Sequence, residues 1–134
     1  MLLEMPIKVN GYDIDVMGIV SNIVYVRWFE DLRQYFLDTY WPYQAMLKAN
    51  QSPVLAKTTV EYKYPITIHD QPIGRIWVEN FGRAKWEMSF EITIEKKVVC
   101  TGKQIGYVVD LERKRPIPMP EGLRKKYEEA LKSS

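Results

Sequence analysis

The chain of 134 residues contains one cysteine, one histidine and no long apolar run. The lone Cys100 excludes a disulfide within the chain. Because no histidine lies near it in the sequence, we interpret it as a buried, unreactive thiol. Without a histidine–cysteine cluster we predict no metal site, and with one histidine a Ser-His-Asp or Cys-His triad is hard to build. Walker-type and dinucleotide-binding glycine loops are also missing from the sequence.

Neither positive nor negative charge is in large excess. Nineteen Lys and Arg residues face 17 Asp and Glu residues, which leaves a formal charge of +2. A charge this small gives no basic footprint for nucleic acid over the whole domain. The N-terminus lacks the basic and apolar regions of a signal peptide, and no apolar stretch approaches the roughly 20 residues that span a bilayer. We therefore predict a cytoplasmic protein with neither a nucleic-acid nor a membrane partner.

What is present fits one globular unit. Hydrophobic residues make up 46% and charged residues 27% of the chain, an ordinary balance for a folded domain. The length suits one domain and leaves little room for two, so we predict a single domain over residues 1–134.

Residues 22–40 carry a helical pattern. Pro42 predicts an end near Trp41, and Ser21 or Asn22 is suited to cap the start. Because the helix is apolar over much of its circumference, we expect it to be buried rather than laid on a surface. The apolar residues recur at three- and four-residue spacing: Tyr25, Trp28, Phe29, Leu32, Tyr35, Phe36 and Tyr40.

Strand patterns surround this helix. A first strand is predicted at Met5–Val9, and residues 55–110 alternate with period two, which is typical of an antiparallel sheet with one buried face. Turn residues separate the runs at 69–72, 81–83 and 95–97, and a shift of apolar parity predicts a β-bulge at Gly102. The clearest alternating run contains Trp86, Met88, Phe90, Ile92 and Ile94.

The tail, Pro120–Lys132, is predicted to be a short amphipathic helix that packs at the end of the domain. The elements together predict an α+β fold in which an antiparallel sheet wraps around one long central helix, the hot-dog arrangement. A cystatin-like or helix-grip fold would give a similar order of elements. Hot-dog sheets usually pair edge to edge, so we expect a homodimer or a dimer of dimers.

Two carboxylates, Asp13 and Asp15, precede Gly18 and the start of the long helix. Free backbone N–H groups at a helix start can bind a developing oxyanion while a neighbouring carboxylate attacks a carbonyl or activates water. Asp, Gly, Ser and Asn are also common turn and capping residues. The residues alone leave both interpretations open.

The spacing of Asp13, Asp15, Gly18, Val20 and Tyr25 resembles the signature of the 4-hydroxybenzoyl-CoA thioesterase family, including its YbgC-like acyl-CoA thioesterase branch. The resemblance implies a hot-dog fold and hydrolysis of an acyl-CoA with no metal or organic cofactor, because water is the second substrate. An acyl-carrier-protein thioesterase and a non-catalytic acyl-binding module are the alternatives.

The resemblance also implies roles for single residues. Asp15 matches the catalytic aspartate, as nucleophile or general base, and the backbone N–H of Asn22 matches the group that polarises the thioester carbonyl. Gly18 lets the chain turn beside the substrate, Asp13 has a structural role, and Tyr25 lies at the substrate site, where packing is the expected role. Many relatives carry a histidine in this segment, which this chain lacks, so its substrate preference stays open.

Phosphate groups of CoA call for cations near the pocket mouth. Lys57, Arg83 and Lys85 are the candidates, because they lie at the predicted starts of the middle strands and in the turn between them. In the family that it resembles, the segment matching Phe81–Lys85 approaches the pantetheine and the nucleotide. Ordinary solvated strand-end cations explain each of them equally well. His69 lies in a turn far from Asp15 in sequence, where we expect a solvated side chain and no catalytic role.

Overall fold

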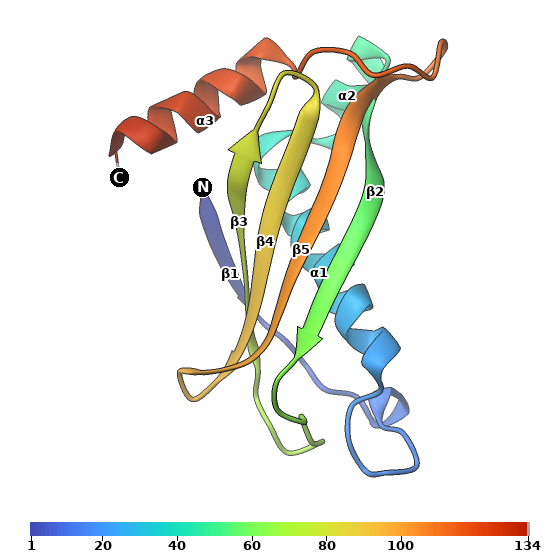
Figure 1. Ribbon diagram of the computed structural model, residues 1–134, viewed down its shortest axis with the longest axis vertical. Coiled ribbons are helices and arrows are strands. Elements are labelled where there is room, and N and C mark those ends of the chain that lie inside the picture. The colour runs from blue at the N-terminus through green and yellow to red at the C-terminus, as the bar shows by residue number, and fades with distance from the viewer. Residues whose placement is uncertain (134) are drawn as a thin grey trace.

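The computed structural model of the chain describes residues 1–133 (Figure 1). These residues form one five-stranded antiparallel sheet with strand order β1-β3-β4-β5-β2, together with a 3-10 turn and three α-helices. The elements are β1 (Leu2–Pro6), a 3-10 turn (Gly11–Asp13), α1 (Asn22–Tyr40), α2 (Tyr43–Ala49), β2 (Gln51–Tyr62), β3 (Ile73–Phe81), β4 (Lys85–Ile94), β5 (Lys97–Asp110) and α3 (Glu121–Ser133).

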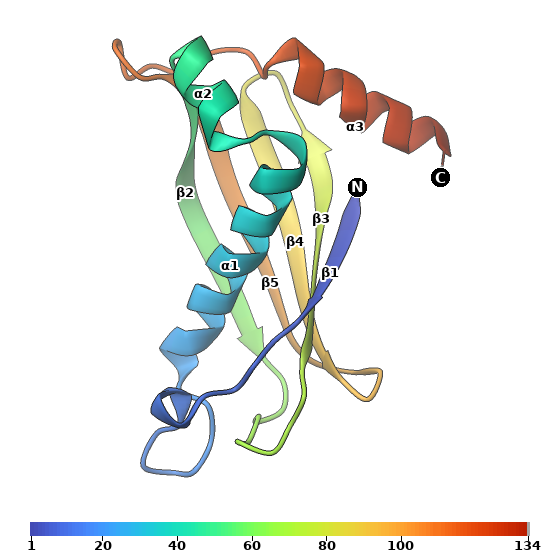
Figure 2. The ribbon, with the colours of Figure 1, turned by 180° about the vertical axis from the view of Figure 1, so that it is seen from behind.

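Helix α1 lies along one face of the curved sheet, as Figure 2 shows. It has the predicted bounds, begins after Ser21 and ends at Trp41. The alternating apolar run on β4 faces it, and Trp86, Met88, Phe90 and Ile92 are all at least 96% buried. The predicted α+β hot-dog fold, with a sheet curved around a central helix, is confirmed.

The centre of the core is a close contact between α1 and the sheet. Phe29 stacks on Phe90 with ring centroids 4.6 Å apart, and its ring presses against the backbone of Gly102. Gly102 is regularly paired with both neighbouring strands, so the β-bulge predicted there is wrong. The register of β4 against β5 shifts instead at Val99, which has no partner between Val98 and Cys100.

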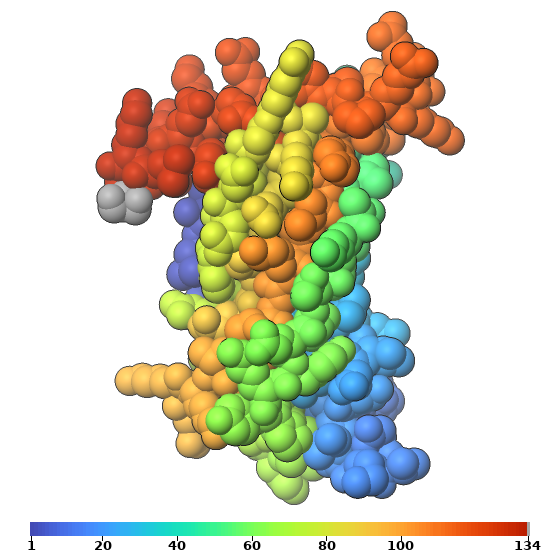
Figure 3. All heavy atoms as spheres, in the orientation of Figure 1, coloured from blue at the N-terminus to red at the C-terminus, as the bar shows by residue number. Residues whose placement is uncertain are grey.

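The parity shift that suggested the bulge has another cause. Gln104 and Gly106 of β5 face inward, while the apolar Ile105 and Tyr107 lie on the outer face of the sheet. Small and polar residues occupy the inner face at this point, so the apolar residues of the strand fall on the outer face instead. The backbone itself keeps its regular alternation there. Figure 3 shows that no helix covers this outer face.

Two boundaries also differ from the predictions. The first strand is Leu2–Pro6 rather than Met5–Val9, because Ile7 and Val9 are buried although the chain has already left the ladder. The short helix α2 was not predicted. It spans Tyr43–Ala49 between the capping residues Pro42 and Asn50. The left-handed backbone of Asn50 (φ 56°) ends the helix, so that β2 begins at Gln51 rather than Leu55.

Burial of α1 is less complete than predicted. Tyr35 is 40% exposed and Ile23 is 72% exposed, because the chain supplies only one sheet and the far side of the helix has nothing to pack on. At the other end of the fold, α3 packs as predicted. Leu123 is buried, and the ring centroids of Tyr127 and Phe81 lie 4.9 Å apart. Arg124 of α3 donates to the carbonyl groups of Phe81 and Gly82.

Candidate active site

A tight loop carries Asp15. An isolated bridge between Ile14 and Val20 closes the loop, and the Asp15 N–H donates to the Ile19 carbonyl at 2.9 Å. Gly18 turns the chain with φ of +79° and donates its N–H to the Asp15 carbonyl at 3.0 Å. A side chain is strained at such a φ, which explains the glycine. The Asp15 carboxylate is exposed and accepts one hydrogen bond, from the Met17 N–H at 2.8 Å.

Asp13 has a different environment. It is 4% exposed, and its Oδ2 accepts the Asn10 N–H at 2.8 Å within the 3-10 turn. Its carbonyl accepts the Ser21 N–H at 2.9 Å, which ties the turn to the residue before α1. Of the two carboxylates, Asp13 therefore holds the loop together and Asp15 is the one that faces solvent.

The start of α1 is uncapped. The Ser21 side chain makes no capping hydrogen bond, and the first turn carries no acidic residue. Val24 N–H donates to the Ser21 carbonyl at 3.0 Å, but among residues 1–133 nothing accepts a hydrogen bond from the Asn22 N–H. An exposed carboxylate six residues before Ser21 can activate water, and the free N–H donors at the positive end of the α1 dipole can polarise a carbonyl group.

Tyr25 and Tyr62 form the wall behind the helix start. Their ring centroids lie 5.0 Å apart, and the Tyr62 hydroxyl donates to the Asn22 carbonyl at 2.9 Å. Tyr25 is 3% exposed, and burial is the main cause that raises its pKa to about 12. Tyr25 therefore packs as a neutral phenol, and Tyr62, 43% exposed, is the accessible ring of this pair.

Apolar side chains surround the loop at its exposed surface. The exposed fraction of each residue lies between 72% and full exposure, which is unusual for large apolar residues. Such a cluster is typical of a surface that binds an apolar ligand or another protein chain. Its members are Tyr12, Val16, Met17 and Ile23.

The three predicted CoA contacts do not lie at this end of the molecule. Arg83 lies in the turn between β3 and β4 and Lys85 is the first residue of β4, at the opposite end of the sheet from the Asp15 loop (Figure 1). Lys57 lies near the middle of β2. Its neighbour Thr58 faces the buried Gln104, so the alternation of the strand turns Lys57 to the outer face. A single protomer thus brings together Asp15, Gly18, Asn22 and Tyr25, but none of the three cations.

A buried polar network on the inner face was not predicted. Gln104 is fully buried. Its Oε1 accepts from Arg33 Nη1 at 2.7 Å, and its Nε2 donates to Glu30 at 3.1 Å. Arg33 and Glu30 also form an ion pair at 2.8 Å. The one sequence signal was a glutamine at an inward position of β5, which only the correct register reveals.

The remaining candidate groups are distant or inert. His69 is exposed in its turn, as predicted. Cys100 is buried, as predicted, and burial raises the pKa of its thiol to about 12. Residues 1–133 hold no group of three His, Cys, Asp or Glu side chains placed to bind a metal ion. No helix within the described part of the chain is long and apolar enough to cross a membrane.

The known proteins to which this chain is similar in sequence are thioesterases. Residues 9–127 match the family described as the thioesterase-like superfamily. The long-chain acyl-CoA thioesterase FadM of Escherichia coli K12 is 25% identical over 132 residues, which cover 97% of this chain and all of FadM.

Solved structures share the fold. DHNA-CoA thioesterase from Staphylococcus aureus superposes with a TM-score of 0.83 at 22% identity, covering 98% of this chain and 90% of that protein. A second S. aureus protein, solved in complex with CoA, has a TM-score of 0.91 at 13% identity over 98% of this chain and 85% of its own. Because the family match spans most of the chain and includes the Asp15 loop, this protein belongs to the thioesterase-like superfamily.

Proposed function

We propose that the chain is a single-domain acyl-CoA thioesterase that hydrolyses an acyl-CoA to a free carboxylic acid and CoA. The observation that carries this proposal is the exposed Asp15 carboxylate in a tight loop directly before the uncapped start of α1. The family match and the acyl-CoA thioesterases among its relatives support thioester hydrolysis as the reaction.

In the proposed mechanism the thioester carbonyl oxygen accepts a hydrogen bond from the Asn22 N–H. The Asp15 carboxylate then either attacks the carbonyl carbon or removes a proton from the water that does so. The positive end of α1 stabilises the oxyanion, and one such donor is typically worth about 10²–10³ in rate. If water attacks, collapse of the intermediate breaks the carbon–sulfur bond, releases the free acid and passes the proton taken up by Asp15 to the CoA thiolate. If Asp15 attacks, breaking the carbon–sulfur bond leaves a mixed anhydride on Asp15; water then hydrolyses it to the free acid, restores the carboxylate and supplies the proton of the CoA thiol. No metal or organic cofactor takes part, because water is the second substrate.

The subfamily is part of the proposal. The spacing of Asp13, Asp15, Gly18, Val20 and Tyr25 supports the 4-hydroxybenzoyl-CoA and YbgC-like branch. FadM is named for long-chain acyl-CoA, and it is a relative over the whole chain. An acyl-carrier-protein thioesterase would use the same loop and would differ by preferring a protein-bound acyl group.

We also propose that the active unit is a homodimer formed through β2. This strand is a 12-residue edge of the sheet, and long open edges favour pairing with another strand. If two β2 strands pair antiparallel about their midpoints, the two copies point in opposite directions along the strands. The Asp15 loop of one copy then approaches the end of the partner that carries the turn with Arg83 and Lys85.

The first test is thiol release from a panel of short, long and aromatic acyl-CoA substrates. We expect Asp15→Asn to lower turnover at least about 10²-fold without loss of stability, because the change conserves shape and removes the charge. Asp38→Asn is the matched control, an exposed aspartate at the other end of α1. Equal turnover by Asp15→Asn and the parent protein would contradict the mechanism. Tight acyl-CoA binding with no turnover by either would favour the acyl-binding module.

The second test mixes two inactive proteins. One chain carries Asp15→Asn and the other carries Arg83→Ala with Lys85→Ala. In a mixed dimer with shared sites, one site has a normal Asp15 loop facing normal cations, so we expect about a quarter of the parent activity to return. If each copy uses its own Arg83 and Lys85, mixing restores nothing.

A further inference from the structure

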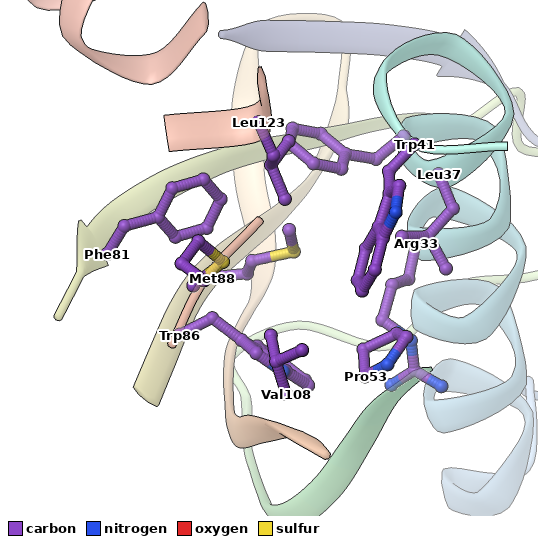
Figure 4. Close-up of a pocket in the computed structure, with 11 residues that line it drawn as sticks. Arg33, Leu37, Trp41, Pro53, Phe81, Trp86, Met88, Val108 and Leu123 are labelled. Carbon is purple, nitrogen blue, oxygen red and sulfur yellow. The ribbon is translucent and has the colours of Figure 1, made fainter. Parts of the chain in front are cut away.

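The two ends of α1 are held differently. At its C-terminal end Leu37 and Trp41 face Trp86 across an apolar pocket with about 20 Å³ of free space, room for about one water molecule (Figure 4). At its start Asn22 and Ile23 are both exposed, and no side chain caps the helix. An uncapped, exposed first turn frays, so a first turn that binds substrate needs another support.

Tyr62 provides this support. It is the last residue of β2, and its hydroxyl donates to the Asn22 carbonyl at 2.9 Å. Its backbone is paired opposite Cys100 of β5, and its ring meets the buried ring of Tyr25 edge-on, with centroids 5.0 Å apart. Because the strand and the ring are both held in place, the hydroxyl is a fixed donor at the start of the helix.

Tyr62 bonds to the carbonyl side of the first turn, which has a different effect from a cap. A capping hydroxyl on Ser21 would accept an N–H group of this turn, and the proposed mechanism needs these groups free. Tyr62 donates to a carbonyl instead, so it holds the turn and leaves the N–H groups open. Within residues 1–133 nothing accepts a hydrogen bond from the N–H of Asn22 or of Ile23.

The Asn22 carbonyl and the Ile23 N–H belong to one planar peptide unit. The Tyr62 hydroxyl therefore fixes the direction of that N–H. Its bond to the carbonyl also polarises the peptide, which makes the Ile23 N–H a stronger donor. The N–H groups of a first helical turn point out of the helix start, where one anionic oxygen can accept from two of them.

We propose that Tyr62 is a positioning residue, which holds the peptide between Asn22 and Ile23 so that both N–H groups bind the thioester oxygen. The inference rests on the proposed function and adds a second donor, the Ile23 N–H, to its oxyanion site. The oxygen gains negative charge as the carbon is attacked. A stronger donor therefore stabilises the transition state more than the bound substrate, and the hydroxyl of Tyr62 acts on kcat through the peptide.

The kinetic test removes one oxygen atom. Tyr62→Phe keeps the ring beside Tyr25 and loses the donor to Asn22. We expect kcat for the fastest acyl-CoA of the panel to fall about 3- to 10-fold, the worth of one hydrogen bond, with KM changed less than about twofold. Tyr64→Phe is the matched control, because Tyr64 is similarly exposed and its ring contact with Lys97 needs no hydroxyl. Turnover by Tyr62→Phe equal to that of the parent, or a loss that falls on KM alone, would overturn the inference.

Infrared spectroscopy measures the polarisation of the bound carbonyl, which a loss of stability alone does not change. The sample is Asp15→Asn protein with an acyl-CoA that is isotope-labelled at the thioester carbonyl. Donors that bind the oxygen lower the carbonyl stretching frequency relative to an unbound carbonyl. We expect Tyr62→Phe in this background to reverse part of that shift, and Tyr64→Phe to leave it unchanged. An equal frequency with and without the Tyr62 hydroxyl would overturn the inference.

Failure of this inference and failure of the proposed function give different results. Hydrolysis by the parent protein together with an equally fast Tyr62→Phe variant would overturn the role of Tyr62 alone, and the Asp15 mechanism would stand. A parent protein that hydrolyses no acyl-CoA would overturn the proposed function and this inference with it.

Discussion

The ring of Phe29 lies so close to the backbone of Gly102 that a Cβ added there would overlap it. Phe29 is fully buried and its ring is also stacked on Phe90, so it cannot move aside. We expect Gly102→Ala to lower the free energy of unfolding by about 1–3 kcal/mol through overpacking. Urea denaturation measures this as a lower midpoint with an unchanged slope.

Gly122→Ala is the control for this prediction. Gly122 lies in α3, and nothing stands within 4 Å of an added Cβ. The same chemical change should therefore leave stability unchanged or raise it by up to about 1 kcal/mol, the helix preference of alanine over glycine. Equal losses in the two variants would show that the Phe29 contact is not the cause.

The network around Gln104 carries a second prediction. Gln104→Met keeps the shape of the side chain but removes the acceptor of Arg33 Nη1 and the donor to Glu30. We expect a loss of about 1–3 kcal/mol in the free energy of unfolding, because a mostly buried guanidinium keeps only part of its hydrogen bonding. Gln34→Met on the exposed side of α1 should change stability by less than about 0.5 kcal/mol. A Gln104→Met protein as stable as the parent would mean that the network contributes no net stability.

Sequence patterns predicted the parts of the fold in which burial follows a simple period. The bounds of α1 and the inward run on β4 were correct because each buries one regular face against the other. Helix α2 was missed because seven residues give too short a pattern. The bulge at Gly102 was misplaced because glycine and glutamine fill the inner face of β5 where Phe29 and the polar network lie.

The site shows a similar division. The Asp15 loop is local in sequence, so its residues were identified together and do lie together. Arg83 and Lys85 were joined to it by resemblance, yet they lie at the far end of the same protomer (Figure 1). Residue patterns along the sequence do not show which strand ends and turns lie at the same end of the folded sheet, so they could not separate these cations from the Asp15 loop.

Asp13 and Asp15 should respond differently to substitution. Asp13→Ala removes the acceptor of the Asn10 N–H inside the folded loop, so we expect a loss of about 1–2 kcal/mol in stability together with slower turnover. Asp13→Asn keeps an acceptor oxygen and should retain most of both. The matched Asp15→Asn should keep stability and lose turnover. Thermal unfolding and thiol release on the same four proteins check the contrast, and an Asp13→Asn variant as inactive as Asp15→Asn would assign chemistry to Asp13.

Cys100 predicts a pH dependence with a definite sign. Burial, with a smaller contribution from Glu61, raises the pKa of its thiol from 9.0 to about 12, so the folded protein keeps the thiol neutral. In the unfolded chain the thiol ionises near its usual pKa of about 8.5. Its contribution to stability is therefore complete below about pH 8.5 and is lost as the pH rises toward 12. Between pH 8 and 10 the parent protein should lose more stability in urea than Cys100→Ala.

The same burial governs the reactivity of this thiol. A disulfide reagent such as dithiobis-nitrobenzoate needs a thiolate that it can reach, and Cys100 offers neither in the folded state. We expect no labelling of native protein at pH 8 on the timescale of an assay, and one thiol per chain in guanidinium chloride. The thiol signal in acyl-CoA hydrolysis then comes from released CoA alone. Rapid labelling of native protein at pH 8 would instead show that β5 opens at Cys100, in conflict with the packing beneath α1.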